Sequence, residues 1–159
     1  MDSDDRKVSL YIGLINIFVY LLYKMNLLNE VPCEGDLISN IKRDFIHIRF
    51  THLFLNLVGL YVLSNIEKTI GKEKFLKLLV FIIIITSVIE SQFYNNYCSI
   101  GFSGILYGLL AYQMLILKKI EIDIIVILLL LYFTEKKDVT SNSFHLIGFF
   151  TGVAGYYVI

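Results

Sequence analysis

The run VFIIII at residues 80–85 decides the fold class of this chain, and the run IIVILLLL at residues 124–131 supports the same conclusion. Working outward from them, apolar stretches separated by short polar connections are found at residues 8–23, 50–66, 75–91, 100–117, 120–134 and 141–159. Most are slightly shorter than the ~20 residues that cross a membrane as a helix, a difference that snorkelling Lys and Tyr side chains can absorb. A soluble protein with so many such helices would have almost no polar faces. The sequence therefore predicts an all-α membrane protein, a bundle of six transmembrane helices.

The composition agrees with one membrane domain. Hydrophobic residues make up 57% of the 159 residues, against about 45–50% in soluble domains. No linker or internal repeat divides the chain, so residues 1–159 are expected to form a single domain in the lipid bilayer. The 14 basic and 14 acidic residues cancel, so no net field favours a nucleic-acid partner.

The basic residues indicate the orientation. With a cytoplasmic N-terminus, more Lys and Arg residues fall on the cytoplasmic side than on the other, and residues 68–77 hold the densest cluster. The first apolar stretch follows the charged segment Met1–Lys7 without a small-residue cleavage site, so we interpret it as a retained helix. The chain consists of a minimal membrane core without additional domains, and this favours a prokaryotic plasma membrane.

Two features of the connections leave alternatives open. Cys33 and Cys98 are too few for a metal site, and the favoured interpretation is two unrelated small apolar residues. A disulfide between them is the alternative if both face an oxidising compartment. The longest connection, about residues 24–49, is expected to lie partly in the membrane interface.

Three of the apolar stretches carry polar residues near their N-terminal ends. These are His47, His52 and Asn56 at the second stretch, Gly101-Phe102-Ser103-Gly104 at the fourth, and His145 with Gly148 and Gly152 at the sixth. Polar groups inside membrane spans are costly and are therefore candidates for function. Because even-numbered spans cross the membrane in the same direction, we expect the three clusters at one depth, near one face.

A serine, histidines and an amide at one depth are what nucleophilic catalysis requires. Ser is a weak nucleophile until a base takes its proton, and the resulting oxyanion needs preorganised hydrogen-bond donors. The fourth and sixth stretches each carry a glycine pair that lets membrane helices approach closely, Gly104 with Gly108 and Gly148 with Gly152. Such an approach would bring His145 within reach of Ser103. The alternative is structural, because a membrane serine often bonds the carbonyl four residues earlier, and such glycine pairs are common in helix packing.

In these motifs the chain resembles the rhomboid family of intramembrane serine proteases. His47-xxxx-His52-xxx-Asn56 is similar to the family's His-xxxx-His-xxx-Asn, and Gly101-Phe102-Ser103-Gly104 is similar to its Gly-x-Ser-Gly, with Tyr107 at the matching aromatic position. His145-xx-Gly148-xxx-Gly152 resembles the catalytic His motif of the sixth span, and Glu67-xxx-Gly71 resembles the Glu-xxx-Gly after the second. The family's Trp-Arg pair in the first loop has no counterpart, since Ile38-Ser39 stands at that distance.

The resemblance implies a rhomboid-like six-helix core. It also implies a serine endopeptidase that cuts transmembrane protein substrates near the non-cytoplasmic face, with no metal or other cofactor. Ser103 would be the nucleophile and His145 the general base. The oxyanion hole would consist of His52, Asn56 and the backbone N–H of Ser103. Tyr107, Gly101 and Gly104 would support the dyad, and His47, Glu67, Gly148 and Gly152 would be structural.

Two other functions are alternatives. A catalytically inactive rhomboid-like protein would bind membrane clients without cleaving them, and loss of Ser103 or His145 would have indicated it. A small transporter would use the polar cluster as a solute or proton path. Inverted repeats or charges deep within several spans would favour a transporter, and the sequence shows neither.

Overall fold

The computed structural model describes residues 6–28, 31, 33, 35–94, 98–118, 122, 125–126, 129 and 139–159. The main helices in this part of the chain are α1 (Lys7–Lys24), α2 (Leu37–Phe45), α3 (Phe50–Leu63), α4 (Asn65–Ile70), α5 (Lys72–Phe93), α6 (Ser103–Leu117) and α8 (Val139–Val158). None of the described residues lies in a β-strand. The predicted all-α fold class is therefore confirmed. The fifth expected stretch, 120–134, lies largely outside the described residues.

The helices suit a membrane by length and composition. Among the described residues, three helical segments are long and apolar enough to cross it: Lys7–Lys24, Phe50–Ile70 (α3 with α4) and Lys72–Phe93. Helix α6 is apolar but shorter. Large apolar side chains of α1 point outward, including Leu10 and Phe18. Outward apolar faces are what a bilayer requires, so this is an integral membrane protein built as a helical bundle.

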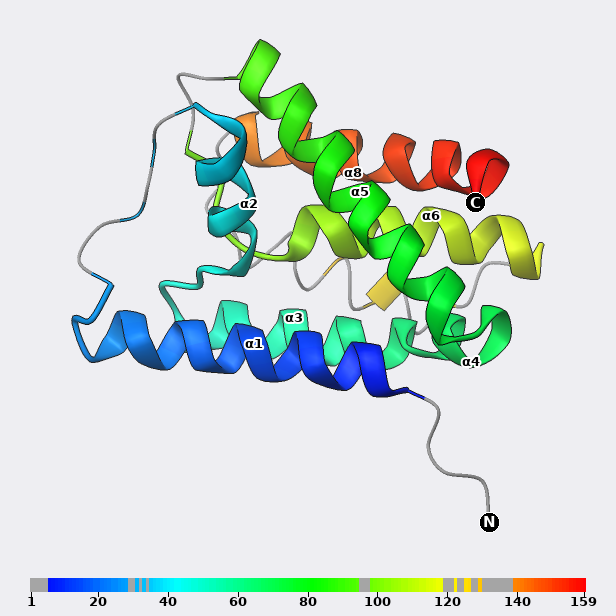
Figure 1. Ribbon diagram of the computed structural model, residues 1–159, viewed down its shortest axis with the longest axis horizontal. Helices are drawn as coiled ribbons and strands as arrows, with labels where there is room; N and C mark the ends of the chain where they lie inside the picture. Colours follow the sequence, from blue (N-terminus) through cyan, green and yellow to red (C-terminus); the bar gives the residue numbers. More distant parts are fainter. Residues whose placement is uncertain are drawn as a thin grey trace.

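Figure 1 shows α1 beside α3 and α6 beside α8, with α5 crossing obliquely over them. The helices α3, α6 and α8 all begin at the end of the bundle where α2 lies, and they run in the same direction. The polar clusters near their N-terminal ends therefore lie at one end of the bundle. Helix α1 begins at the opposite end.

The long connection between α1 and α3 contains α2, which packs against α5. The carboxylate of Asp36 caps this helix by accepting hydrogen bonds from the amides of Ile38 and Ser39, at 2.9 and 3.1 Å. Hydrogen bonding from Ser39 lowers the pKa of Asp36. The buried residues of α2 are polar: Ser39, Asn40 and Arg43.

Glu67 ties α4 to the start of α1. Its fully buried carboxylate accepts hydrogen bonds from the amides of Val8 and Ser9, at 2.8 and 2.9 Å, and from the Ser9 hydroxyl at 2.7 Å. These amides belong to the first turn of α1, where no intrahelical acceptor exists. Four residues later, Gly71 turns the chain from α4 into α5 with φ +82°, a conformation that favours glycine.

Cys33 and Cys98 form a disulfide, with Cα atoms 5.1 Å apart. The interpretation of these cysteines as two unrelated small apolar residues is therefore wrong. They are 65 positions apart in the sequence, and they meet only because the segment before α2 lies beside the segment before α6. The disulfide links those two segments at the end of the bundle where α3, α6 and α8 begin.

Candidate active site

The side chains of Ser103 and His145 meet between α6 and α8. The hydroxyl Oγ of Ser103 lies 2.9 Å from Nε2 of His145, and both residues are buried. Ser103 is the first residue of α6, so the carbonyl four residues earlier lies outside its helix. Its hydroxyl has an acceptor on another helix, Nε2 of His145. With Nδ1 protonated, Nε2 accepts the hydroxyl proton.

The glycine pairs bring the two helices together. A Cβ added at Gly148 would overlap the carbonyl of Gly104, and one added at Gly152 would overlap the carbonyl of Gly108. A Cβ at Gly108 would stand 2.9 Å from the carbonyl oxygen of Gly148. The backbones of α6 and α8 are therefore in direct contact along two turns, as small residues allow in membrane helices. This contact fixes the distance between Ser103 and His145.

Tyr107 stacks on the imidazole of His145. The ring centroids are 4.3 Å apart and the planes are inclined by 17°. Tyr107 lies one turn after Ser103 on α6, so both side chains project from the same face of the helix. The histidine is therefore held between a hydroxyl on one ring edge and an aromatic ring on its face.

The turn before Ser103 is held at two successive amides. The N–H of Gly101 donates to the carbonyl of Arg43 at 3.0 Å, and the N–H of Phe102 points to Nε2 of His47 at 3.5 Å. Gly101 has φ +108°, which favours glycine. The end of α2 and the residues that follow it thus hold the turn that comes directly before Ser103.

His47 is fully buried and contacts this turn directly. Its Nδ1 lies 3.2 Å from the carbonyl of Phe45, and its ring meets the ring of His52 edge-on with centroids 5.0 Å apart. Since Nε2 faces an N–H donor, the proton belongs on Nδ1, which then donates to Phe45. His47 therefore joins the segment after α2, the turn at Phe102 and the ring of His52.

His52 and Asn56 lie on the side of α3 that faces this turn. The imidazole of His52 packs against Gly101, where an added Cβ would stand 2.9 Å from Nε2 of His52. The Nδ2 of Asn56 donates to the backbone carbonyl of His52 at 2.8 Å. An amide nitrogen carries two N–H groups, so this bond uses only one of them. The oxyanion role of both residues stays a prediction.

Comparison with known proteins agrees with this geometry. A family model described as the Rhomboid domain matches residues 34–159, which is most of the chain. The chain belongs to the rhomboid family. A protein of Acanthamoeba polyphaga mimivirus named "Putative rhomboid protein L523" is 29% identical over 114 residues, which cover 69% of this chain and 67% of the relative.

Sequence reasoning missed the part that Arg43 and Asn40 play in this rhomboid. The guanidinium of Arg43 donates to Oδ1 of Asn40, and Nδ2 of Asn40 donates to the carbonyl of Ser87 on α5 at 3.1 Å. A signal was present, because residues 39, 40 and 43 have the spacing of one helical face. Ser87, the partner of Asn40 on α5, lies 47 positions away, and no local pattern predicts it.

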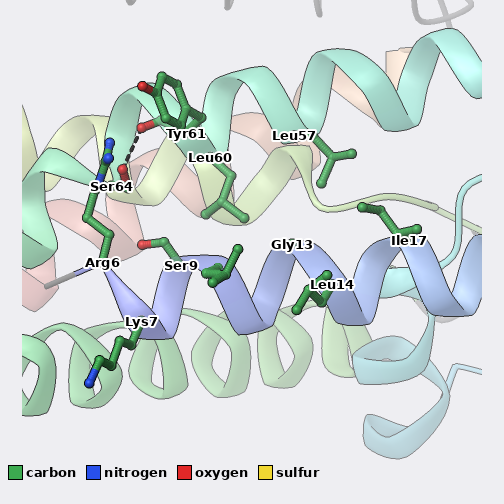
Figure 2. Close-up of a pocket in the computed structure, with 11 residues that line it drawn as sticks. Arg6, Lys7, Ser9, Gly13, Leu14, Ile17, Leu57, Leu60, Tyr61 and Ser64 are labelled. Atoms are coloured by element: carbon green, nitrogen blue, oxygen red, sulfur yellow. Dashed lines mark hydrogen bonds between the residues drawn. The ribbon is translucent and has the colours of Figure 1, made fainter. Parts of the chain in front are cut away.

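Figure 2 shows a groove between α1 and α3, apart from Ser103 and His145. Its volume is about 350 Å³. At one end the guanidinium of Arg6 lies 5.0 Å above the ring of Tyr61. The hydroxyl of Ser64 donates to the carbonyl of Tyr61 at 2.6 Å. The remaining walls are mainly apolar and include the outward-facing Leu10 and Leu14. The groove therefore belongs to the lipid-facing surface of the bundle.

Proposed function

We propose that this rhomboid is an intramembrane serine endopeptidase that cleaves transmembrane substrates through a Ser103–His145 dyad. The observation that carries the proposal is the 2.9 Å separation between Oγ of Ser103 and Nε2 of His145, at a buried position. A base within hydrogen-bond reach of a serine hydroxyl is the geometric requirement for nucleophilic activation.

The reaction follows from that geometry. Oγ of Ser103 attacks the peptide carbonyl while Nε2 of His145 takes the hydroxyl proton. The tetrahedral intermediate collapses, and His145 returns the proton to the leaving amine as an acyl-enzyme forms. Water, deprotonated by His145, then hydrolyses the ester and regenerates the serine. Tyr107, stacked on the imidazole, would keep the ring in its orientation through these proton transfers.

The negative charge on the tetrahedral intermediate must be stabilised by hydrogen-bond donors. The N–H of Ser103 belongs to the first turn of α6, where amides have no intrahelical acceptor. The second N–H of Asn56 Nδ2 and the imidazole of His52 would supply the others. Removing one such hydrogen-bond donor from a serine protease lowers kcat by about 10²–10³-fold. After Ser103 and His145, these donors are therefore the next residues to mutate.

The active site would open toward the non-cytoplasmic face. The disulfide between Cys33 and Cys98 lies at the same end of the bundle as the dyad, and disulfides persist in oxidising compartments. Helix α1 begins at the opposite end (Figure 1), which agrees with a cytoplasmic N-terminus. The prokaryotic plasma membrane expected from the minimal core has no support in the comparison, because the named relative is viral.

Cleavage of a reconstituted substrate tests the proposal. The purified protein is placed in liposomes with a panel of single-span substrates that carry reporters on both ends, and the products are located by mass spectrometry. We expect cuts near the non-cytoplasmic end of the substrate span. Ser103→Ala and His145→Ala should each lower the rate by about 10³-fold or more. Cleavage that survives Ser103→Ala would overturn the dyad. A folded parent that binds the substrate spans but cuts none would support the client-binding alternative.

A further inference from the structure

The segment that ends α2 controls the backbone just before the nucleophile. The carbonyl of Arg43 accepts two hydrogen bonds, one from the N–H of Ile46 at 3.1 Å and one from the N–H of Gly101 at 3.0 Å. The first closes α2, and the second fixes the turn two residues before Ser103. The position of this carbonyl therefore sets, together with Nε2 of His47, where the turn lies.

The side chain of Arg43 holds that carbonyl in place. It is 1% exposed, and its guanidinium donates to Oδ1 of Asn40. Asn40 in turn donates to the carbonyl of Ser87 on α5. The buried Glu90 lies three residues after Ser87, on the same face of α5. Burial lowers the pKa of Arg43, whereas the negative charge of Glu90 opposes that effect. Helix α2 is thus fastened to α5 by polar groups that leave little freedom of position.

We propose that Arg43 is a positioning residue for the nucleophile of this rhomboid. It acts through its own carbonyl on Gly101. Its guanidinium is bonded to Asn40, which bonds the carbonyl of Ser87 and so keeps α2 against α5. Arg43 does not touch the reacting atoms. The inference rests on the proposed function for its effect on catalysis, but its effect on the turn is independent of that function.

A general structural role would look different from a positioning role. A buried Arg that only stabilises the fold would lower the melting temperature when removed and leave the reactivity of each folded molecule unchanged. A positioning residue would change the reactivity of Ser103 in molecules that are still folded. It would also loosen the turn at residues 101–103 more than the rest of the bundle.

The variants are chosen to separate these cases. Arg43→Gln alone would remove a positive charge that acts on the buried Glu90. The main variant is therefore the charge-balanced pair Arg43→Gln with Glu90→Gln. Lys42→Gln is the matched control, because it removes the same charge from the neighbouring, exposed position on α2. Arg43→Lys keeps the positive charge on a shorter side chain. We expect its labelling rate at Ser103 to lie between that of the double variant and that of the parent.

Two measurements are made on the full chain in detergent, below its melting temperature. The first is the rate at which a fluorophosphonate probe labels Ser103 per folded molecule. The second is amide hydrogen exchange across residues 98–106. In the double variant we expect labelling to slow by about 10–100-fold, because small displacements of reacting groups have effects of that size. Exchange at Gly101 and Phe102 should speed up at the same time, with α5 unchanged. Lys42→Gln should match the parent.

The outcomes separate this inference from the proposed function. Labelling and exchange in the double variant equal to those of the parent would overturn the positioning role. Faster exchange at Gly101 and Phe102 would support it even if the parent itself reacts with no probe. A folded parent that is never labelled would instead contradict the proposed protease activity.

Discussion

The imidazole of His145 stacks on the ring of Tyr107, with centroids 4.3 Å apart and planes inclined by 17°. Because the two residues come from different helices, the two rings can stack only while α6 and α8 keep their positions relative to each other. Both the ring contact and the helix contact therefore lead to predictions about the proposed dyad of Ser103 and His145.

Replacing the ring of Tyr107 tests the stack. Tyr107→Ala should lower kcat by about 2- to 12-fold, because stacking of this kind contributes about 0.5–1.5 kcal/mol and a factor of ten corresponds to about 1.4 kcal/mol. Tyr107→Phe keeps the ring and should stay close to the parent. The measurement is steady-state cleavage of a reconstituted substrate with kcat and KM separated. Equal losses in both variants would show that the hydroxyl, and not the ring, is needed.

Adding one methyl group between α6 and α8 tests the helix contact. Gly148→Ala should destabilise the protein by at least about 2 kcal/mol, because the new Cβ would overlap the backbone of Gly104, which cannot rotate away. Gly13→Ala on α1 is the matched control, since its Cβ would lie 3.6 Å from Leu57, an ordinary contact. Unfolding midpoints in detergent compare the two. If Gly148→Ala is tolerated as well as Gly13→Ala, the close backbone contact is wrong.

The buried carboxylate of Glu67 gives a third prediction. In Glu67→Gln an NH₂ group would face an N–H or O–H donor at the start of α1, so at least one hydrogen bond is replaced by a clash of donors. We expect a loss of about 2–3 kcal/mol, in the range for hydrogen bonds to charged groups. Ser9→Ala removes only the hydroxyl bond and should cost about 1 kcal/mol. Thermal unfolding of both variants checks the order, and a larger loss in Ser9→Ala would contradict it.

Asp44, near the end of α2, predicts a dependence of stability on pH. Burial, and secondarily the charge of Glu90, raise the pKa of Asp44 well above 3.8, and Arg43 opposes this shift. The folded state then binds more protons than the unfolded state. This contribution to stability is present below the unfolded pKa and is lost as the pH rises through the raised folded pKa.

Removing the carboxylate should therefore stabilise the protein at neutral pH. We expect Asp44→Asn to melt at a higher temperature than the parent at pH 7, with the difference shrinking toward zero near pH 4. Melting curves at a series of pH values test this. A variant that melts below the parent at pH 7 would mean that the ionised carboxylate of Asp44 stabilises the fold.

Much of the fold follows from sequence periodicity and length. The stretches 8–23 and 75–91 are close to α1 and α5 because uninterrupted apolar runs bounded by charges have definite ends. The break between α3 and α4 at Ser64 was not predicted, although the polar residues Ser64 and Asn65 stand at that point. The shared direction of α3, α6 and α8 was predicted by counting membrane crossings.

Some contacts of the candidate site were also expected from the sequence, and others were not. The approach of Ser103 to His145 was expected from the glycine pairs, whose spacing is local. The contacts that hold the turn before Ser103 were not, because Arg43 and Gly101 are distant in sequence and interact through backbone atoms. The disulfide between Cys33 and Cys98 was expected only as the alternative, because the two cysteines are 65 positions apart and no local pattern pairs them. A contact between backbone atoms that are distant in sequence has no local sequence pattern from which it could be predicted.

The most direct test of the account is the reactivity of Ser103 itself. The detergent-purified parent, Ser103→Ala and His145→Ala are incubated with a fluorophosphonate probe, and the modified residue is located by peptide mass spectrometry. The account predicts covalent labelling of the parent at Ser103 and none in either variant. A folded parent that is not labelled, or labelling that persists in His145→Ala at the parent's rate, would contradict an activated serine at this site.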